Sequence, residues 1–251
     1  IEPVEVGRVL LVSPNAELTV RDATLRNGFV ANAEAGGNVW VQSFASLRLQ
    51  RVRITNGRAG RGGGIATAGA ARLEVSQSLI DGNSALGANT LGGGIFVEGQ
   101  TLSTVVTIHD STIVGNSAPF GGGIAVANNV AEPPALRGVT LARNTGGGGI
   151  YTAQTGARIQ GSILAGNTFT QSVGSGQITQ PANCAVQGGV TDEGGNIESD
   201  DTCGLSDASR VNTDPMLAAA LDATAQPPVL AIAPTSPAVD FAACGGRTVD
   251  Q

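Results

Sequence analysis

The feature that most constrains the fold of this chain is a short unit that recurs along it at uneven intervals. Each copy holds a short apolar strand, a turn residue that is usually Asn, a variable loop, and a run of glycines that opens the next strand. The clearest glycine runs end at Ile65, Ile95, Ile124 and Ile150. Recurrence at this period indicates stacked units. A parallel β-helix keeps its strands in register and takes up length differences in its loops, so the uneven spacing favours this fold over a helical repeat.

The same alignment predicts a column of asparagines inside the stack. The apolar residues expected to point inward share one strand position, and they are Leu25, Ile54, Ile80, Ile113, Leu141 and Leu164. Three positions after the last four come Asn83, Asn116, Asn144 and Asn167. Asn27 and Asn56 lie one position early, so the column is expected to begin only at Asn83. Stacked side-chain amides can hydrogen-bond to the coils above and below as a ladder.

The repeat fades after Asn167, and the C-terminal part has a different character. The polar stretch from Gln171 to Gln180 is expected to be a loop. Three cysteines suggest one disulfide, one leftover thiol and an oxidising compartment. A bridge between Cys184 and Cys203 would close a loop of moderate size, and it leaves Cys244 without an obvious partner.

The Pro-rich residues 204–251 are expected to form an extended tail folded along the stack. The side chains expected to pack inward from this tail are Leu217, Leu221, Leu230, Ile232 and Val239. We therefore predict an all-β chain with one domain over residues 1–251, a single-stranded parallel β-helix or solenoid. Its coils occupy about residues 9–180, and an irregular, disulfide-pinned tail occupies about residues 181–251. The usual chirality of parallel crossovers favours a right-handed helix.

Charge and hydropathy argue against two classes of partner. The net charge of −6 argues against nucleic acid, and no run approaches the ~20 apolar residues of a membrane span. All 14 basic residues are arginines, nine of which precede residue 73, whereas acidic residues crowd the C-terminal part. Such a lopsided chain has either an ordinary solvated surface or an Arg-bearing face for an anionic polymer.

The C-terminal motifs resemble a known family. They are NC at 183–184, GGNIESDDTC at 194–203, NTDP at 212–215, LAIAPTSPAVD at 230–240 and DQ at 250–251. Together with the repeats, they resemble the choice-of-anchor Q domain of bacterial right-handed parallel β-helix proteins. The resemblance implies an exported surface protein with an anchoring signal, and it implies no catalytic residues. The sequence departs from the family pattern in two ways. The usual His is replaced near Val229-Leu230. No anchoring signal follows Gln251, and we expect that this signal was removed or never present.

One polar patch could support catalysis on the outer face of the stack. His109 is the only histidine, Asp110 follows it, and the alignment places Arg137 one coil beyond. A polysaccharide lyase needs a base for the proton next to a uronate carboxylate and a cation to neutralise that carboxylate. His109, Asp110 and Arg137 are therefore the catalytic candidates. Polar side chains are also ordinary on the solvent-facing side of an outer sheet, which explains these residues as well.

Calcium is the one cofactor that the sequence leaves open. Carboxylates are its preferred ligands, and they crowd one C-terminal stretch, at Asp192, Glu193, Glu198, Asp200 and Asp201. Solubility alone also explains an acidic loop, without a bound ion. Zinc is not expected with a single histidine and bridged cysteines, and the glycine runs lack the lysine of a phosphate-binding loop. The default expectation is that there is no cofactor.

These observations favour a non-catalytic, exported bacterial surface module with an adhesive or spacer role. Its expected location is secreted or at the cell surface, and its expected partner is an extracellular polysaccharide or the surface of a host or neighbouring cell. The alternative is a lyase or glycoside hydrolase that acts on an acidic polysaccharide at the outer sheet. A third reading is a subunit of an extracellular assembly that stacks through open coil ends or edges.

Overall fold

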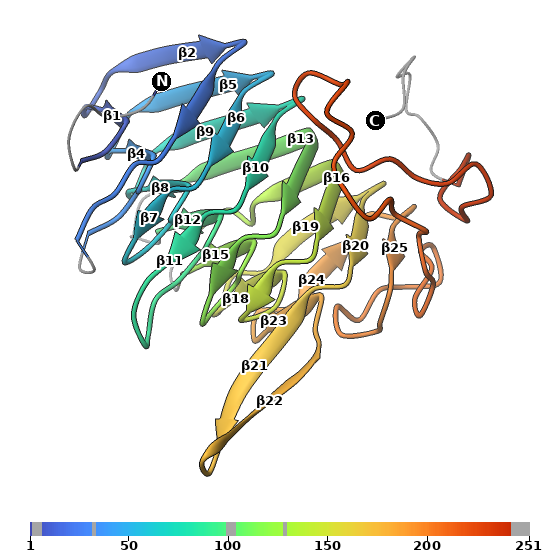
Figure 1. The fold of residues 1–251 in the computed structure, drawn as a ribbon. Helices are drawn as coiled ribbons and strands as arrows, with labels where there is room; N and C mark the ends of the chain where they lie inside the picture. Colours follow the sequence, from blue (N-terminus) through green and yellow to red (C-terminus); the bar gives the residue numbers. More distant parts are fainter. Residues whose placement is uncertain (2–6, 32–33, 99–103, 128–129, 242–251) are drawn as a thin grey trace.

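The computed structural model describes residues 1, 7–31, 34–98, 104–127 and 130–241. Over these residues the chain is an all-β parallel solenoid of about six turns, and no helix occurs within the described ranges. Figure 1 shows the coils stacked from the blue N-terminal strands to the orange strands near the C-terminus. The parallel solenoid predicted from the repeats is confirmed. Cys244 and the Asp250-Gln251 pair lie outside the described residues.

One side of the solenoid is a seven-stranded parallel sheet, here called sheet A. The Ile residues that end the glycine runs occupy one row of it, because Ile95 lies in register with both Ile65 and Ile124. Across the sheet the strands are β1 (Leu10–Val12), β4 (Val39–Val41), β8 (Ile65–Thr67), β12 (Ile95–Val97), β15 (Ile124–Val126), β18 (Ile150–Thr152) and β23 (Cys184–Val186).

The twelve-stranded sheet B supplies the next two sides, which meet at a corner. Strands β13 (Val105–Val114) and β16 (Ala135–Ala142) run through this corner without a break. The first side also holds β2 (Glu17–Arg21), β5 (Ser46–Gln50), β9 (Arg72–Ser76), β19 (Ala157–Gln160) and β24 (Val190–Asp192). The second side also holds β3 (Thr24–Arg26), β6 (Arg53–Thr55), β10 (Leu79–Asp81), β20 (Ile163–Ala165) and β25 (Ile197–Glu198).

Two corners of each coil depend on left-handed backbone. At the corner within sheet B, Arg51 and Asp110 have φ of 52° and 49°. At the next corner, Gly82 and Gly115 have φ of 63° and 64°, and Asn56 takes the same conformation with φ of 54°. Asn tolerates the left-handed region better than other side chains. Asn56 therefore belongs to a corner column one position before the asparagine ladder, as its spacing in the sequence indicates.

A short four-stranded sheet, sheet C, follows that second corner and leads back toward sheet A. Its two-residue strands are β7 (Arg58–Ala59), β11 (Ser84–Ala85), β14 (Ser117–Ala118) and β17 (Thr145–Gly146).

The core is a continuous column of aliphatic side chains inside the coils. Ile80 lies in register with Ile54 on one side and Ile113 on the other, and all three are fully buried. Leu25, Leu141 and Leu164 continue this row and are at most 2% exposed. Burying each such side chain contributes about 1.5–3 kcal/mol. A single coil could not bury these residues, so the stack itself is the unit of stability.

The polar stretch after Asn167 is not a loop. It forms an antiparallel hairpin of β21 (Thr168–Val173) and β22 (Gly176–Pro181), which projects from the stack (Figure 1). After the hairpin, β23, β24 and β25 pair with β18, β19 and β20 and so continue the stack.

The tail crosses the outer face of the second side of sheet B, drawn in red in Figure 1. Leu230 is buried there against Leu79, Val114 and Ala142, and Leu217 and Leu221 pack against the same cluster. The guanidinium of Arg143 donates to the carbonyl oxygens of residues 217, 218 and 219 and so fastens the tail. Val239 is 40% exposed, so its predicted inward packing is wrong.

The predicted disulfide is confirmed. Cys184 on β23 is bonded to Cys203, with 4.9 Å between the Cα atoms, and both residues are buried. The bridge ties the last coil to the segment that follows β25. None of the residues described here forms a helix long and apolar enough to cross a membrane.

Candidate functional site

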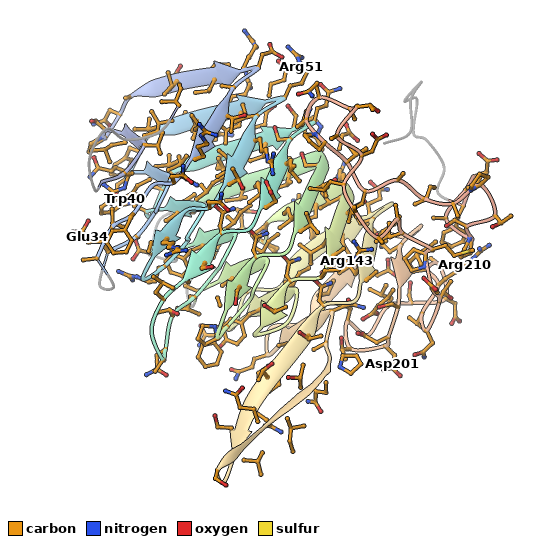
Figure 2. The ribbon with its side chains drawn as sticks, viewed as in Figure 1. Glu34, Trp40, Arg51, Arg143, Asp201 and Arg210 are labelled. Carbon is orange, nitrogen blue, oxygen red and sulfur yellow. A yellow bond between two sulfur atoms is a disulfide. The ribbon has the colours of Figure 1, made fainter. Side chains whose placement is uncertain are left out.

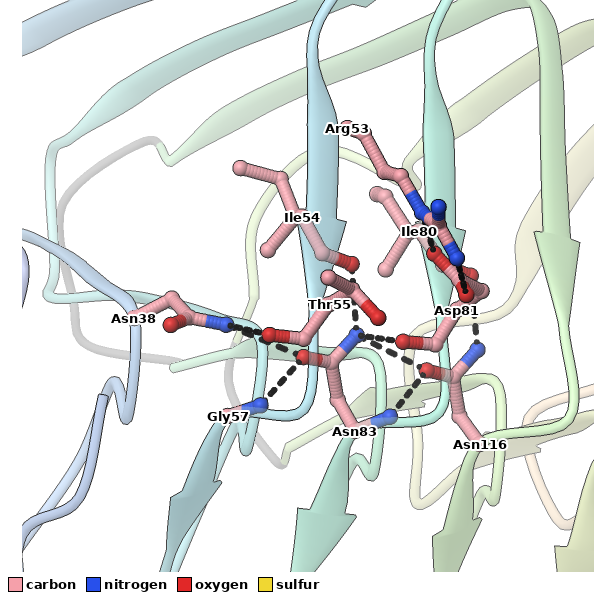
Figure 3. Close-up of polar contacts among 9 residues, drawn as sticks. All are labelled: Asn38, Arg53, Ile54, Thr55, Gly57, Ile80, Asp81, Asn83 and Asn116. Atoms are coloured by element: carbon pink, nitrogen blue, oxygen red, sulfur yellow. Dashed lines mark hydrogen bonds and ion pairs between the residues drawn. The ribbon is translucent and has the colours of Figure 1, made fainter. Parts of the chain in front are cut away.

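The asparagines predicted from the repeat form an uninterrupted hydrogen-bonded column in the interior. The Nδ2 of Asn83 donates to the Oδ1 of Asn116 at 2.9 Å, and Asn116 donates in the same way to Asn144 at 3.0 Å. Asn144 donates to Asn167 at 2.9 Å. Each Oδ1 also accepts the backbone N–H of the preceding ladder residue, and each Nδ2 also donates to a strand carbonyl oxygen, as Figure 3 shows for Asn116 and Ile80. These buried amides are therefore satisfied by the coils around them.

The ladder is longer than the sequence pattern indicates. At its start, Asn38 donates from Nδ2 to the Oδ1 of Asn83 at 3.1 Å (Figure 3). At its end, Asn167 donates to the Oδ1 of Asn183 at 2.8 Å. Asn38 stands in place of the third glycine of its run, and Asn183 holds the equivalent position after Pro181-Ala182; each lies just before a strand of sheet A. Simple alignment of the turn positions misses them because they come from the opposite side of the coil.

Close packing explains why Asn and Gly exchange places between the turn position and the third position of the glycine run. A Cβ atom on Gly57 would lie 2.4 Å from the Nδ2 of Asn38, so the turn position stays bare where the amide comes from the glycine run. In the middle coils the roles are reversed, because a Cβ on Gly94 would lie 3.2 Å from the Cγ of Asn116 and 2.7 Å from the carbonyl oxygen of Gly123. In these coils only one of the two positions can carry a side chain.

A second polar column, which the sequence did not reveal, lies at the corner inside sheet B. Ser78 and Ser111 each accept a backbone N–H from the preceding coil through Oγ, at 3.0 and 3.1 Å. Ser162 does the same for Val139, and the backbone N–H of Ser162 in turn donates to Asn196. Together with the ladder, these contacts satisfy buried backbone groups at two corners of the stack.

The outer face of sheet B carries the predicted catalytic candidates. In the register of the strands, His109 lies between Ser76 of β9 and Arg137 of β16. The Nδ1 of His109 lies 3.1 Å from the Oδ2 of Asp110, and its Nε2 lies 3.9 Å from the Oε1 of Glu74. His109 and Asp110 are thus in contact, and Glu74 is an additional carboxylate that the sequence did not single out.

Arg137 forms its ion pair with Glu193 and not with the residues around His109. Its Nη2 lies 3.2 Å from the Oε2 of Glu193, and Arg158 approaches the same carboxylate at 4.0 Å. Arg137 is therefore a register neighbour of His109 that directs its charge toward the C-terminal end of the stack. The structure brings together two of the three catalytic candidates in contact and places the third beside them.

Three further arginines on sheet B and its corner tie neighbouring coils together. Arg48 pairs with Glu74 at 2.9 Å. Arg51, on the corner labelled in Figure 2, holds both oxygens of Asp22, and Arg53 holds both oxygens of Asp81. Each pair joins one coil to the next along the axis. These ion pairs give three of the nine arginines before residue 73 a structural role without an anionic ligand.

The acidic residues proposed for calcium are distributed over separate structural roles. Asp192 accepts hydrogen bonds from Ser206, Ser209, Gly194 and Asn196. Burial acts to raise the pKa of Asp192, but the hydrogen bonds from Ser206, Gly194 and Ser209 outweigh it and lower the pKa. Glu193 binds Arg137, as described above.

Asp200 and Glu198 form the other half of this acidic stretch. Asp200 accepts the backbone N–H of Asn183 at 3.1 Å and the hydroxyl of Thr202 at 2.7 Å. Glu198 is fully buried and accepts the backbone N–H of Cys203 at 2.9 Å. Burial and the neighbouring carboxyl of Asp200 raise the pKa of Glu198 to about 8. Asp201 is exposed (Figure 2). Within the described part of the chain, no three His, Cys, Asp or Glu side chains form a group that could hold a metal ion.

The outer face of sheet A is apolar, which the sequence pattern also did not reveal. Trp40, Phe96 and Tyr151 alternate on it with Ala66 and Ala125 in strand register. The rings are largely covered, because Phe96 is only 2% exposed and the guanidinium of Arg8 lies 4.8 Å from the ring centre of Trp40. This row is a small second core and not an open aromatic platform.

Comparison with known proteins adds no relative: no family model, no curated protein and no solved structure matches the chain.

Proposed function

We propose that this chain is a non-catalytic module of an exported bacterial surface protein of the choice-of-anchor Q kind, with an adhesive or spacer role. The observation that carries the proposal is where the motif residues lie. Asn183 ends the ladder, its side chain donates to Ser199, and its backbone N–H donates to Asp200. Cys184 and Cys203 form the disulfide beside them. The NC and GGNIESDDTC parts of the motif therefore lie together at the C-terminal end of the ladder, which supports an architectural role for them.

Two further observations support a rigid, extracytoplasmic module. Disulfides persist in oxidising compartments such as the cell exterior. The ladder, the serine column and the axial ion pairs join successive coils, which favours a rigid stack. A spacer or an adhesin needs such a rigid body to hold a binding surface away from the cell.

The second candidate is a lyase or hydrolase of an acidic polysaccharide. The observation that favours it is the contact of His109 with Asp110, next to Arg137 in strand register. A cation is needed to neutralise a uronate carboxylate in the transition state. Arg137 would first have to leave Glu193, which makes this candidate the weaker one.

A panel of acidic and neutral polysaccharides separates the two proposals. Purified protein is incubated with each polymer, and new reducing ends and new unsaturated ends are measured. Binding to the same polymers and to intact cells is measured in parallel. His109→Ala is compared with Gln160→Ala, which changes another outward residue of the same strand column.

We expect no cleavage by any of these proteins. For an adhesin we also expect binding that both variants retain. Cleavage that is lost in His109→Ala and kept in Gln160→Ala would contradict the non-catalytic role and establish the enzyme.

A further inference from the structure

The β21–β22 hairpin is the part of the fold that projects from the solenoid. It extends beyond the coils (Figure 1), and residues 171–181 are exposed along their whole length. Strand β21 is anchored at its base, because Thr168 exchanges backbone hydrogen bonds with Asn144 and Gly148. Apart from its pairing with β21, β22 makes no backbone hydrogen bond to any other described residue. Its outer edge therefore presents free backbone groups to solvent.

The outer part of the hairpin carries two apolar side chains that the described chain leaves exposed. Cross-strand pairing places Phe169, Val173 and Ile178 on the same face, with glutamines between them. Val173 is 52% exposed and Ile178 is 48% exposed. A two-stranded ribbon is marginally stable by itself, whereas three or more strands with an apolar face are stable. The hairpin thus gains stability from any strand that is added to β22.

The charge distribution indicates what kind of strand can be added. Residues 159–191 contain no ionisable side chain, although the chain as a whole carries a net charge of −6. Natural edge strands are usually protected by charged side chains or proline, and here only Pro181, at the base of β22, serves that purpose. Two copies of the chain repel each other over most of their surface, but they can approach at the hairpin without like charges in contact.

We propose that β22 pairs with β22 of a second copy of this chain, antiparallel and about a two-fold axis. Ile178 then lies opposite its own copy, and two hairpins become one four-stranded sheet with Val173 and Ile178 of both copies on the same face. A two-fold contact of this kind is self-complementary and closes after two copies. Strand addition at an exposed edge is an established mode of recognition that relies on main-chain hydrogen bonds. The proposal goes beyond the adhesive or spacer role and stands without it.

The contact is expected to be weak when the protein is free in solution. Two six-residue strands bury less than the roughly 1,000 Å² expected of a stable interface. Reversible association at high protein concentration is the expected result. Copies that are held close together on one surface would reach that concentration locally.

Sedimentation velocity over a concentration series tests the proposal. Every protein carries Cys244→Ser, so that a thiol cannot cross-link two chains. We expect the mass of the otherwise wild-type protein to rise from that of one chain toward twice that value as concentration increases. Ile178→Lys and Ile178→Glu should each remain monomeric, because each places two like charges at the two-fold axis. An equimolar mixture of the two variants should associate again, because the opposite charges then meet.

The matched control is Val211→Lys, which changes an exposed apolar residue away from the hairpin and should associate like the wild type. Circular dichroism and melting curves verify that all variants are folded. A wild-type protein that stays monomeric at every concentration overturns the proposal. Association that survives in both Ile178 variants places the contact elsewhere, and failure of the mixture to associate overturns the two-fold pairing of β22.

Discussion

Replacing Asn116 with alanine tests the ladder at its centre. Asn116 is fully buried and makes four side-chain hydrogen bonds of 2.9–3.0 Å. Figure 3 shows those with Asn83 and Ile80. In Asn116→Ala, the Nδ2 of Asn83 keeps its bond to the carbonyl oxygen of Ile54, and the Oδ1 of Asn144 keeps the backbone N–H of residue 116. The backbone N–H of Asn83 is left without a partner. The carbonyl oxygen of Ile80 loses only its second donor, because the register of β10 and β13 also places the backbone N–H of Val114 on it. A buried group left without a partner costs ~1–3 kcal/mol, so the free energy of unfolding should fall by about that amount.

Equilibrium urea unfolding, followed by far-UV circular dichroism, measures this loss. The matched control is Asn89→Ala, the same chemical change at an exposed turn position. Asn38→Ala should lose a comparable amount to Asn116→Ala, because Asn38 is a member of the same ladder. If Asn116→Ala stays within about 0.5 kcal/mol of Asn89→Ala, the range of an ordinary surface substitution, the reasoning about satisfied amides is refuted.

Three further predictions follow from the corner, cap and tail contacts. The folded protein holds a proton on Glu198 between pH 4.5 and about 8 that the unfolded chain has lost, so the free energy of unfolding should fall as pH rises through this window, by up to ~1.4 kcal/mol per pH unit. Urea unfolding at several pH values should show this slope in the wild type and a flatter one in Glu198→Gln; equal slopes would contradict the assignment. Gly94→Ala should lower the melting temperature, because its Cβ would meet the carbonyl oxygen of Gly123 at 2.7 Å, whereas Gly176→Ala, whose nearest atom lies at 3.7 Å, should not. Arg143→Ala should make the tail around residues 217–230 a faster target in limited proteolysis without unfolding the coils, and unchanged cleavage rates would show that Leu230 and its neighbours hold the tail alone.

The sequence predicts the stack because its strongest signals are local and periodic. Inward residues such as Ile80 and Ile113 alternate with outward ones within short β-branched strands, and the same alternation sets the strand register. The four predicted asparagines lie on one column for the same reason. The Cys184–Cys203 bridge can be predicted by counting cysteines, since three cysteines allow few pairings.

The features that the sequence did not reveal depend on contacts between different sides of a coil. Asn38 supplies, from the other side of the coil, the amide that a turn asparagine supplies in the middle coils. The only signal in the sequence is that Asn38 stands in the glycine run and Gly57 at the turn, which reverses the usual placement of Asn and Gly. The hairpin had a signal in its Gly174-Ser175 turn, flanked by Thr, Gln, Val and Ile, but its polar composition suggested a loop. The partners of Arg137 and Asp192 come from residues far away in sequence, so spacing alone could not identify them.

The asparagine ladder has a direction as well as a length. Every amide from Asn38 to Asn167 points its N–H toward the C-terminal end of the stack and its carbonyl toward the N-terminal end. Aligned amide dipoles add along an axis, as they do in an α-helix, so the row ends with a partial positive charge at Asn183. The carboxylate of Asp200 accepts a hydrogen bond from Asn183 there. The asparagine row is therefore polarised along the axis of the stack, and a carboxylate lies at its positive end.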